Sequence, residues 1–344
     1  MEPKLLERHA GILEILISDY IASAEPVGSR TIAKKYAGHL SPATIRNVLS
    51  DLTEMGFLTQ PHTSAGRVPT GAGMRYFVDT LLKKRELSDA EMEAIRECCA
   101  GDEREVMSII QNTSKLLAQV SHYVGLVMTP STEEMIFKQI QFMPLSKNKV
   151  LGIFVSRDGI VQNRLIETGE DFNFSEIDKI SNYCNNSFHG MTLEDALDKI
   201  ERELATDYAK YDKMLRHAML FSREVLSCIP GSELVVGGEI QLLDTPEFSN
   251  SEEFRRVVRE LEEKNKVVKL LERCREGQGV RIFIGSDSPE GRGLDLVGIV
   301  GAPYKREGRT VGTLGVIGPM RMDYSRVVPI VDFTAKVLGD ILDA

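Results

Sequence analysis

The hydrophobic pattern of residues 5–56 predicts three short helices that share one core. Apolar residues recur at the spacing of one helical face in each of three segments. They are Ile12, Leu13, Leu16, Ile17, Tyr20 and Ile21 in the first, Val27, Ile32 and Tyr36 in the second, and Ile45, Val48, Leu49 and Leu52 in the third. The link between the second and third segments, residues 37–40, is short and contains Gly38, as a turn between two packed helices requires.

The third segment carries clear signals for the start and the end of its helix. Ser41 is suited to cap the N-terminus, and Pro42 falls at the first helical position, where a missing N–H costs nothing. Gly56 follows the last apolar residue, where a left-handed conformation is favoured. The sequence therefore predicts a helix that begins at Pro42 and ends just before Gly56.

The other face of this third helix begins with small or hydrogen-bonding side chains, which are Ala43, Thr44, Arg46, Asn47 and Ser50. Side chains of these types read base edges in a DNA major groove. Arginine binds guanine, asparagine binds adenine, and a small apolar group contacts the thymine methyl. For this helix alone, an ordinary solvated face is an equally good interpretation.

A short β-ribbon is predicted after this helix. Residues 57–60 and 68–69 are the candidate strands, and the two prolines of this stretch confine them to short edge strands. The loop tip offers His62, Ser64 and Arg67 as phosphate or minor-groove contacts, although such side chains are also common in solvated loops.

Helix, turn, helix and ribbon together form the sequence pattern of a winged helix-turn-helix, which presents one helix to a DNA major groove. The domain would span residues 1–85 and close with a helix from Thr70 to Lys84. The start of its second helix adds Ser29, Arg30 and Thr31 to the candidate DNA contacts, and Ser29 is also a plausible helix cap.

Charge separates this segment from the rest of the chain. Residues 1–85 contain 11 Lys or Arg and 8 Asp or Glu, whereas the whole chain contains 42 and 51 and has a net charge of −9. A basic segment on an acidic chain is typical of a DNA-reading module attached to a soluble body. A winged helix that binds another protein is the less favoured alternative, because the polar edge and the basic excess both suit DNA.

Beyond residue 85 the pattern predicts an α+β chain. The acidic, helix-prone stretch 86–104 is expected to be a linker, and a helix is expected over 105–120. A last helix begins near Tyr324. Six strands are expected in two groups, at 137–143, 150–155 and 160–167, and then at 280–284, 296–303 and 309–318.

The region between the two groups of strands holds too much structure for a loop. Helices are expected at 175–188, 193–204 and 208–228, and a strand at 234–243. We therefore expect residues 172–251 to form an inserted α+β module within a discontinuous domain made of residues 105–171 and 252–344. A long charged helix over 252–274 would lead back into the sheet of that domain.

No motif for catalysis or cofactor binding occurs in the sequence. It lacks GxGxxG, a Walker lysine loop, HExxH and GxSxG. Its five cysteines form no CxxC pair, and its six histidines show no metal-ligand spacing. We therefore expect no enzyme activity, no cofactor and no metal. The adjacent Cys98 and Cys99 and the glycine-rich loop 285–293 are better explained as helix and connecting residues than as a sensor or an anion site.

Neither a membrane span nor a secretion signal is expected. No window approaches the roughly 18 uninterrupted apolar residues that a spanning helix needs. The start, MEPKLLERHAG, interleaves charges with its apolar residues, unlike a signal peptide. An odd number of cysteines in a long chain also argues against a disulfide framework, which favours a cytosolic protein.

Four long runs of sequence resemble a known family. They are AEPVGSRTIAKKY, LSPATIRNVLSDL and QPHTSAGRVPT near the start, and GTLGVIGPMRMDYSRVVPIVDFTAKVL at 312–338. All are similar to the heat-inducible transcription repressor HrcA, a bacterial family, and the order of the runs and the chain length fit as well. The stretch from about 165 to 260 is looser, and no residue role is carried over there.

This resemblance implies a GAF-like sensory fold for the discontinuous domain and a role in dimerisation for the inserted module. It further implies a cytoplasmic, nucleoid-associated homodimer that represses chaperone operons by binding double-stranded DNA at an inverted-repeat operator. Its activity would be supported by the GroEL chaperonin and lost on heat stress. The alternative is a metabolite-responsive winged-helix repressor with a ligand-binding GAF-like domain. An enzyme fused to a DNA-binding domain is the remaining hypothesis, and the missing motifs disfavour it.

Overall fold

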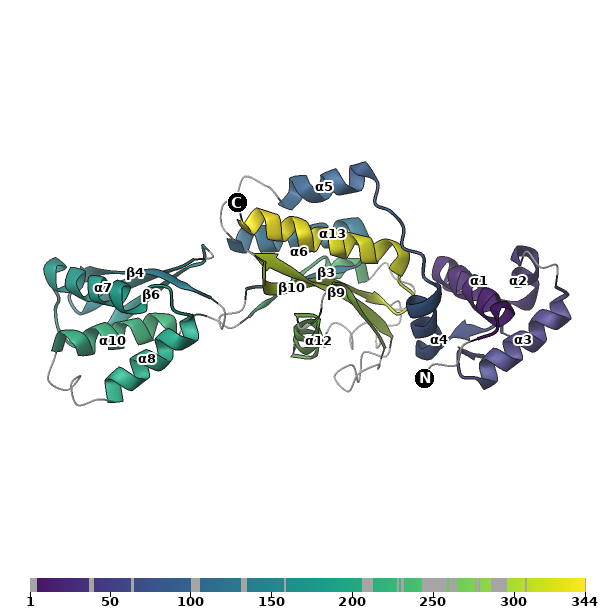
Figure 1. The fold of residues 1–344 in the computed structure, drawn as a ribbon, viewed down its shortest axis with the longest axis horizontal. Helices are drawn as coiled ribbons and strands as arrows, with labels where there is room; N and C mark the ends of the chain where they lie inside the picture. The colour runs from purple at the N-terminus through teal and green to yellow at the C-terminus, as the bar shows by residue number, and fades with distance from the viewer. Residues whose placement is uncertain are drawn as a thin grey trace.

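The computed structural model describes residues 5–36, 40–62, 65–99, 106–130, 135–157, 159–205, 213–227, 229, 232–242, 259, 265–275, 277, 279–285, 296–306 and 308–343. These residues form three parts that lie in a row (Figure 1). A helical N-terminal domain is followed by a central domain with a five-stranded sheet, and an inserted module carries a sheet of its own. The central domain lies between the other two parts.

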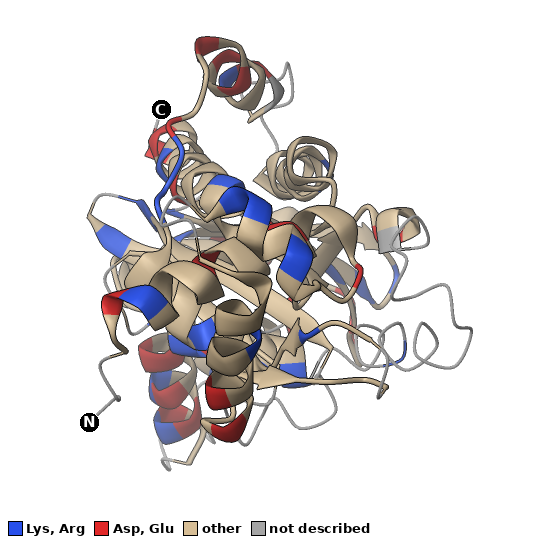
Figure 2. Cartoon of the chain, turned by 90° about the vertical axis from the view of Figure 1, so that its right-hand side faces the viewer, with Lys and Arg blue, Asp and Glu red and all other residues tan. Residues whose placement is uncertain are grey.

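The N-terminal domain contains the three helices and the ribbon that the sequence predicts. Its elements are α1 (Glu7–Ser23), α2 (Ser29–Lys35), α3 (Pro42–Glu54), β1 (Leu58–Thr59), β2 (Val68–Pro69) and α4 (Gly71–Tyr76). The apolar faces of α1, α2 and α3 are buried against one another, which confirms the predicted helical periodicity. Figure 2 looks onto the end of the molecule that carries this domain. The predicted turn at 37–39 lies outside the described residues.

Local chemistry fixes the two ends of α3, as predicted. The Thr44 N–H donates a hydrogen bond of 3.1 Å to the Ser41 side-chain oxygen, and Pro42 is the first helical residue. Past the helix, Gly56 adopts a φ of +81°, a conformation that disfavours residues with a Cβ. Gly73 is required for packing, because a Cβ there would lie 2.1 Å from the Phe57 carbonyl oxygen.

The helix predicted from Thr70 to Lys84 is shorter and less regular than expected. After α4 the chain passes into a π-helical turn, η1 (Phe77–Leu81), and it becomes extended at Leu82. The wider turn brings both Phe77 and Val78 into the interior, where they are buried.

The central sheet is antiparallel, with the strand order β7-β3-β10-β9-β8. Its strands are β3 (Val124–Met128), β7 (Leu234–Gly237), β8 (Arg281–Ile284), β9 (Val297–Arg306) and β10 (Arg309–Pro319). The helices α6 (Val106–Ser121) and α13 (Tyr324–Asp343) cover one face of the sheet, and α12 (Asn265–Arg275) covers the other (Figure 1). Neighbouring strands β3 and β10 are separated in sequence by the whole inserted module.

The stretch expected to be a linker is part of the central domain. Residues 89–99 form α5 (Asp89–Cys99), and its buried Ile95 and Cys99 pack with Leu116 of α6 and Val337 of α13. α5 is amphipathic and buries its apolar side against α6 and α13. The acidic composition of this stretch does not reveal that contact.

The inserted module is larger than the sequence suggested. The strands β4 (Phe137–Ser146), β5 (Lys149–Ser156) and β6 (Val161–Glu167) pair with one another in a separate sheet, and within the described residues they pair with no strand of the central sheet. The helices α7 (Phe174–Phe188) and α10 (Lys213–Leu226) pack on one face of this sheet, and α8 (Leu193–Ala205) packs on α10. The predicted boundary at residue 172 is therefore wrong, because strand periodicity does not identify pairing partners. The shared core starts at Met135 and reaches Ile229.

Two other expectations near the module also need correction. The strand expected over 234–243 ends at Gly237, continues as the 3-10 turn η3 (Glu239–Leu242), and belongs to the central sheet rather than the module. Of the helix expected over 252–274, the structure describes α12 and residue 259, and the remaining residues lie outside the described part. Residues 286–293 of the glycine-rich loop also lie outside it.

No helix among the described residues combines the length and the apolar character needed to cross a bilayer.

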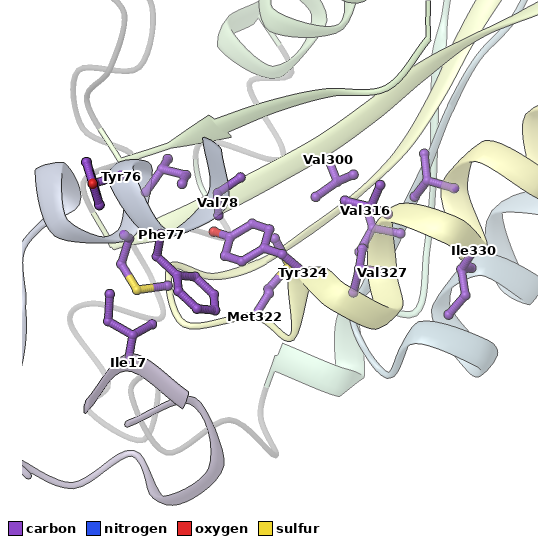
Figure 3. Close-up of a cluster of buried hydrophobic side chains, with 14 of the residues drawn as sticks. Ile17, Tyr76, Phe77, Val78, Val300, Val316, Met322, Tyr324, Val327 and Ile330 are labelled. Carbon is purple, nitrogen blue, oxygen red and sulfur yellow. The ribbon is translucent and has the colours of Figure 1, made fainter. Parts of the chain in front are cut away.

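One hydrophobic cluster joins the N-terminal domain to the central domain. Figure 3 shows Phe77 and Val78 of η1 between Ile17 of α1 and the side chains of Met322 and Tyr324. All five are at least nine-tenths buried. The two domains therefore share a core instead of meeting across a wet surface, and their relative orientation is set by close packing.

Hydrogen bonds between charged side chains and backbone atoms reinforce this junction. Arg321 donates to the Ile21 carbonyl at 2.9 Å, and Arg75 of α4 donates to the Ile282 carbonyl of β8 at 2.6 Å. Each guanidinium group satisfies a carbonyl of the other domain, so each bond also specifies the docking register.

An acidic residue of α5 completes the junction. Glu91 lies 3.5 Å from Arg85 and 3.5 Å from Arg326 of α13. Hydrogen bonds from the Ser88 backbone and hydroxyl lower the pKa of Glu91, and the two arginines act in the same direction. Arg321 and Arg326, near the start of α13, thus have a structural role, in which Arg321 joins the two domains and Arg326 pairs with Glu91.

We predict that Phe77→Ala destabilises the protein by about 3–5 kcal/mol, because it opens a cavity in the shared core. The matched control is Phe174→Ala at a side chain that is 69% exposed, which should cost at most about 0.5 kcal/mol. Urea unfolding followed by circular dichroism measures both. Equal costs for the two variants would contradict the assigned role of Phe77.

Candidate nucleic-acid interface

The polar edge predicted on α3 faces solvent. Ile45, Val48, Leu49 and Leu52 form the buried side of the helix. On the other side, Ala43, Arg46, Asn47 and Ser50 are exposed, and Thr44 is half-buried. The structure therefore presents the predicted side chains on the outside of the domain, at the N-terminal part of a capped helix.

A hollow of about 480 Å³ lies between the start of α2, the middle of α3 and the base of the β1–β2 ribbon. We call it the arginine hollow, and it is lined by Val27, Gly28, Ser29, Arg30, Arg46, Leu49, Gln60, Ala65, Gly66 and Arg67. Three guanidinium groups and no carboxylate are among these residues. Such a surface attracts anionic groups of the size of a phosphate.

Arg67 lies at the base of the ribbon, so its predicted place at the loop tip is wrong. Its backbone N–H and C=O both bond to Val27 at 2.9 Å. Its Nε donates to the Thr53 hydroxyl of α3 at 3.1 Å. The β-bridge with Val27 fixes the backbone of Arg67 next to the α1–α2 link. The hydrogen bond to Thr53 of α3 holds its guanidinium beside the hollow.

The other predicted contacts are placed as follows. Gly28, and not Ser29, is the N-cap of α2, so Ser29 is the first residue of the helix and lines the hollow with Arg30. Thr31 and His62 are exposed and do not line the hollow. Ser64 lies outside the described residues.

Two residues of this region were missed by sequence reasoning. Gln60 lines the hollow and donates from its side chain to the Ala65 carbonyl at 3.0 Å, which braces the ribbon. Gly66 permits the ribbon to touch the α1–α2 link, because a Cβ there would lie 2.5 Å from the Val27 carbonyl carbon and oxygen. A glycine beside a predicted strand was the available signal, since it often marks a close backbone approach.

Charge is distributed unevenly along α3. Its two acidic residues, Asp51 and Glu54, lie in the second half of the helix, and its first turn contains no acidic residue. Asp51 is turned toward α1, where its carboxylate lies 3.3 Å from the His9 ring nitrogen. The positive end of the helix dipole and Arg46 therefore act together at the N-terminal half. Figure 2 shows Lys and Arg positions on the helices of this end of the molecule.

Outside this interface, the described part of the chain shows no metal centre. No group of three His, Cys, Asp or Glu side chains there is arranged to hold a metal ion. Burial raises the pKa of the Cys184 and Cys274 thiols to about 12, which keeps them protonated and unreactive. Burial also lowers the pKa of His217.

The family model and the related sequences all point to the same family. Residues 107–328 match the family model described as HrcA protein C terminal domain. A protein of Geobacter sulfurreducens named heat-inducible transcription repressor HrcA is 43% identical over 337 residues, with 98% of each chain covered. A protein of the same name from Syntrophobacter fumaroxidans is 36% identical over 341 residues, again with 98% of each chain covered.

A solved structure shows the same fold. It is titled only as a hypothetical protein, and it aligns over 99% of each chain with a TM-score of 0.65 and 20% sequence identity. This likeness concerns the fold and carries no functional information.

We predict that Gly66→Ala displaces the ribbon from the α1–α2 link and costs about 1–3 kcal/mol, because backbone atoms of Val27 cannot yield to the new methyl group. The matched control is Gly71→Ala, where a Cβ meets nothing within 4 Å. Hydrogen exchange at the Val27 and Arg67 amides measures the displacement. Unchanged protection of both amides in Gly66→Ala would show that the ribbon contact is not held this way.

Proposed function

This chain belongs to the HrcA family, and from that membership we propose that it is a heat-inducible transcription repressor that binds operator DNA as a homodimer. The observation that carries the DNA-binding part is the exposed polar edge of α3 beside the arginine hollow. A repressor needs an element that reads bases and a surface that holds phosphates, and the two lie side by side here.

In this proposal the N-terminal domain is a winged helix-turn-helix. α2 and α3 are the helix pair, α3 is the recognition helix, and the β1–β2 ribbon is the wing. The support is the packing of α2 on α3 and the tie between Val27 and Arg67, which fixes the ribbon beside both helices. Ala43, Thr44, Asn47 and Ser50 then contact bases in the major groove.

The arginine hollow would hold the DNA backbone next to the bases that α3 reads. Ser29, Arg30, Arg46 and Arg67 line it from three elements, so a phosphate there meets several donors at once. Thr31, His62 and Ser64 remain proposed contacts to the flanking backbone. A pseudo-symmetric operator of inverted-repeat form follows from two such domains in one dimer.

The homodimer is supported by exposed apolar side chains on one sheet face of the inserted module. The helices α7 and α10 cover one face of the β4–β5–β6 sheet, and the opposite face is its outer face. Paired residues of antiparallel strands point to the same side, and the outer face carries the apolar pairs Met143 with Leu151, Leu151 with Leu165, and Val155 with Val161. Between them lies Ile153, whose paired residues Gln141 and Asn163 are polar. Met143, Val161 and Leu165 are 43%, 60% and 46% exposed.

A second copy of the same face is a natural partner for this surface. An exposed apolar face on a monomer marks an interaction site, and a two-fold axis makes one patch complementary to itself. The dimer would then place its two N-terminal domains on the same operator, as an inverted repeat requires.

The proposed link to heat runs through folding. The central sheet pairs β3 with β10 only after the whole inserted module has been made, and non-local pairing of this kind folds slowly and exposes apolar surface. Support by the GroEL chaperonin, which the family resemblance implies, would relieve this problem. On heating, other unfolded proteins would occupy the chaperonin, active repressor would fall, and transcription of chaperone operons would rise.

The central domain is proposed to be GAF-like, because a single antiparallel sheet with helices on both faces suits a sensory α/β domain. A metabolite-responsive repressor is the second candidate function. A basic cleft where this domain meets α4, lined by Arg75, Arg273 and Arg281, favours it. A protein that acts on chromosomal DNA belongs in the bacterial cytoplasm, close to the nucleoid.

We predict that Arg46→Ala and Asn47→Ala each weaken operator binding by about 1–3 kcal/mol and relax base preference at one position. The control is Arg309→Ala at an exposed arginine of β10, which removes the same charge far from α3. Fluorescence anisotropy with operator variants measures both affinity and preference. Parent-like affinity in both α3 variants would refute the recognition edge.

We predict that Leu165→Lys converts the protein to a monomer, because a charge enters the centre of an apolar contact. Ile240→Lys is the matched control, since Ile240 is 76% exposed and lies on the central domain. Sedimentation velocity separates the species. A dimer that survives Leu165→Lys at micromolar concentration would place the interface elsewhere.

A further inference from the structure

A second basic cleft lies where the N-terminal domain meets the central domain. It has a volume of about 520 Å³, and we call it the junction cleft. It is lined by Arg75, Asp79, Arg273, Val280, Arg281, Ile282 and Phe283. Arg75 belongs to α4, Arg273 to α12 and Arg281 to β8, so three separate elements direct arginines to one place.

The charge of this cleft is opposite to the net charge of the chain beyond residue 85. Among the described residues, three guanidinium groups and one carboxylate line it. Beyond residue 85, by contrast, the chain has 43 Asp or Glu and 31 Lys or Arg. A positive cleft on an otherwise acidic body is a specific feature and does not follow from the composition.

Arg281 is held in a defined position. One terminal nitrogen of its guanidinium donates to the Arg273 carbonyl at 2.8 Å. Gly277 leaves room for the rest of the group, since a Cβ at Gly277 would lie 2.5 Å from the Arg281 Nε and 3.0 Å from Cζ. The guanidinium therefore occupies space that any other residue at position 277 would restrict.

The other two arginines are also oriented by neighbours. Arg75 donates to the Asp79 carboxylate at 2.7 Å and to the Ile282 carbonyl at 2.6 Å. The Arg273 guanidinium lies over the Phe283 ring, 5.6 Å from its centroid. Side chains fixed in this way lose little entropy when a ligand binds.

We propose that the junction cleft binds a small phosphorylated metabolite. Guanidinium groups match phosphate oxygens in geometry and charge. The described lining of the cleft contains three of them and one carboxylate, so its net charge is positive. The volume suits a small molecule and is too limited for a folded partner. Val280, Ile282 and Phe283 provide an apolar wall for the organic part of such a ligand.

A ligand in this cleft would touch two domains at once. α4 moves with the DNA-binding helices, and β8 is an edge strand of the central sheet. Binding would strengthen the link between Arg75 and β8 and alter operator affinity, and operator would alter ligand affinity by the same factor. This regulatory consequence rests on the proposed function, but ligand binding itself does not and is measured without DNA.

The experiment uses the full chain and inorganic pyrophosphate, the simplest probe that carries the phosphate chemistry. Pyrophosphate should raise the melting temperature of the parent protein in a saturable way, in a background of constant ionic strength. Arg281→Gln should weaken its affinity roughly tenfold or more, because a charge-assisted contact is lost. Gly277→Ala should weaken it too, by displacing the guanidinium.

The matched control is Arg309→Gln, an exposed arginine of β10 outside the cleft, which should bind pyrophosphate within about twofold of the parent. Equal affinity in the parent, Arg281→Gln and Arg309→Gln would overturn the proposal, and so would the absence of any saturable shift. Weaker operator binding by Arg281→Gln without a pyrophosphate effect would also overturn it, because the cleft would then hold DNA backbone. If the protein bound pyrophosphate but no operator, the proposed function would be contradicted and the ligand-binding proposal would stand.

Discussion

The packing of Phe77 and Val78 between α1 and the start of α13 is the contact on which the rest of the structure depends. It makes one core out of two domains, so α3 is held at a fixed orientation to the central sheet. Arg75 and Arg321 add register to this packing through carbonyls of the opposite domain. Because the N-terminal domain is packed against the central domain, a conformational change in the central domain can alter its position. A DNA-binding domain on a flexible linker would not respond in this way.

The three parts, which lie in a row in Figure 1, present different surfaces. The N-terminal domain presents a polar helix edge and the arginine hollow, and the inserted module at the far end presents a sheet face with exposed apolar side chains. The central domain connects them and must keep their geometry. Two contacts with different chemistry, one charged and one apolar, are thus separated by a packed body, which suits a protein that pairs with itself and with a polyanion.

Sequence reasoning succeeded where the determining forces are local. The period of α3, the Ser41 cap and the Gly56 stop act over one or two helical turns, so the exposed edge Ala43–Ser50 could be predicted. It failed where distant segments choose partners. The strands of 137–167 have the period of any strand, and only their shared core with α7 and α10 assigns them to the module. The junction cleft joins α4 to β8 across 207 residues, which no local pattern encodes.

The most direct test of the account is affinity cleavage of the operator. An iron chelate attached to Asn47→Cys, in a chain with serine at positions 98 and 228, places a cleaving group on the exposed edge of α3; Cys99, Cys184 and Cys274 are buried. The protein concentration is raised until the operator is saturated, which offsets the weaker binding expected from the loss of the Asn47 side chain. The account predicts two cleavage zones in the major groove, related by the dyad of the inverted repeat and separated by a whole number of turns of about 10–10.5 base pairs. Uncleaved DNA under conditions of full binding, or a single zone on one side of the operator, would contradict it.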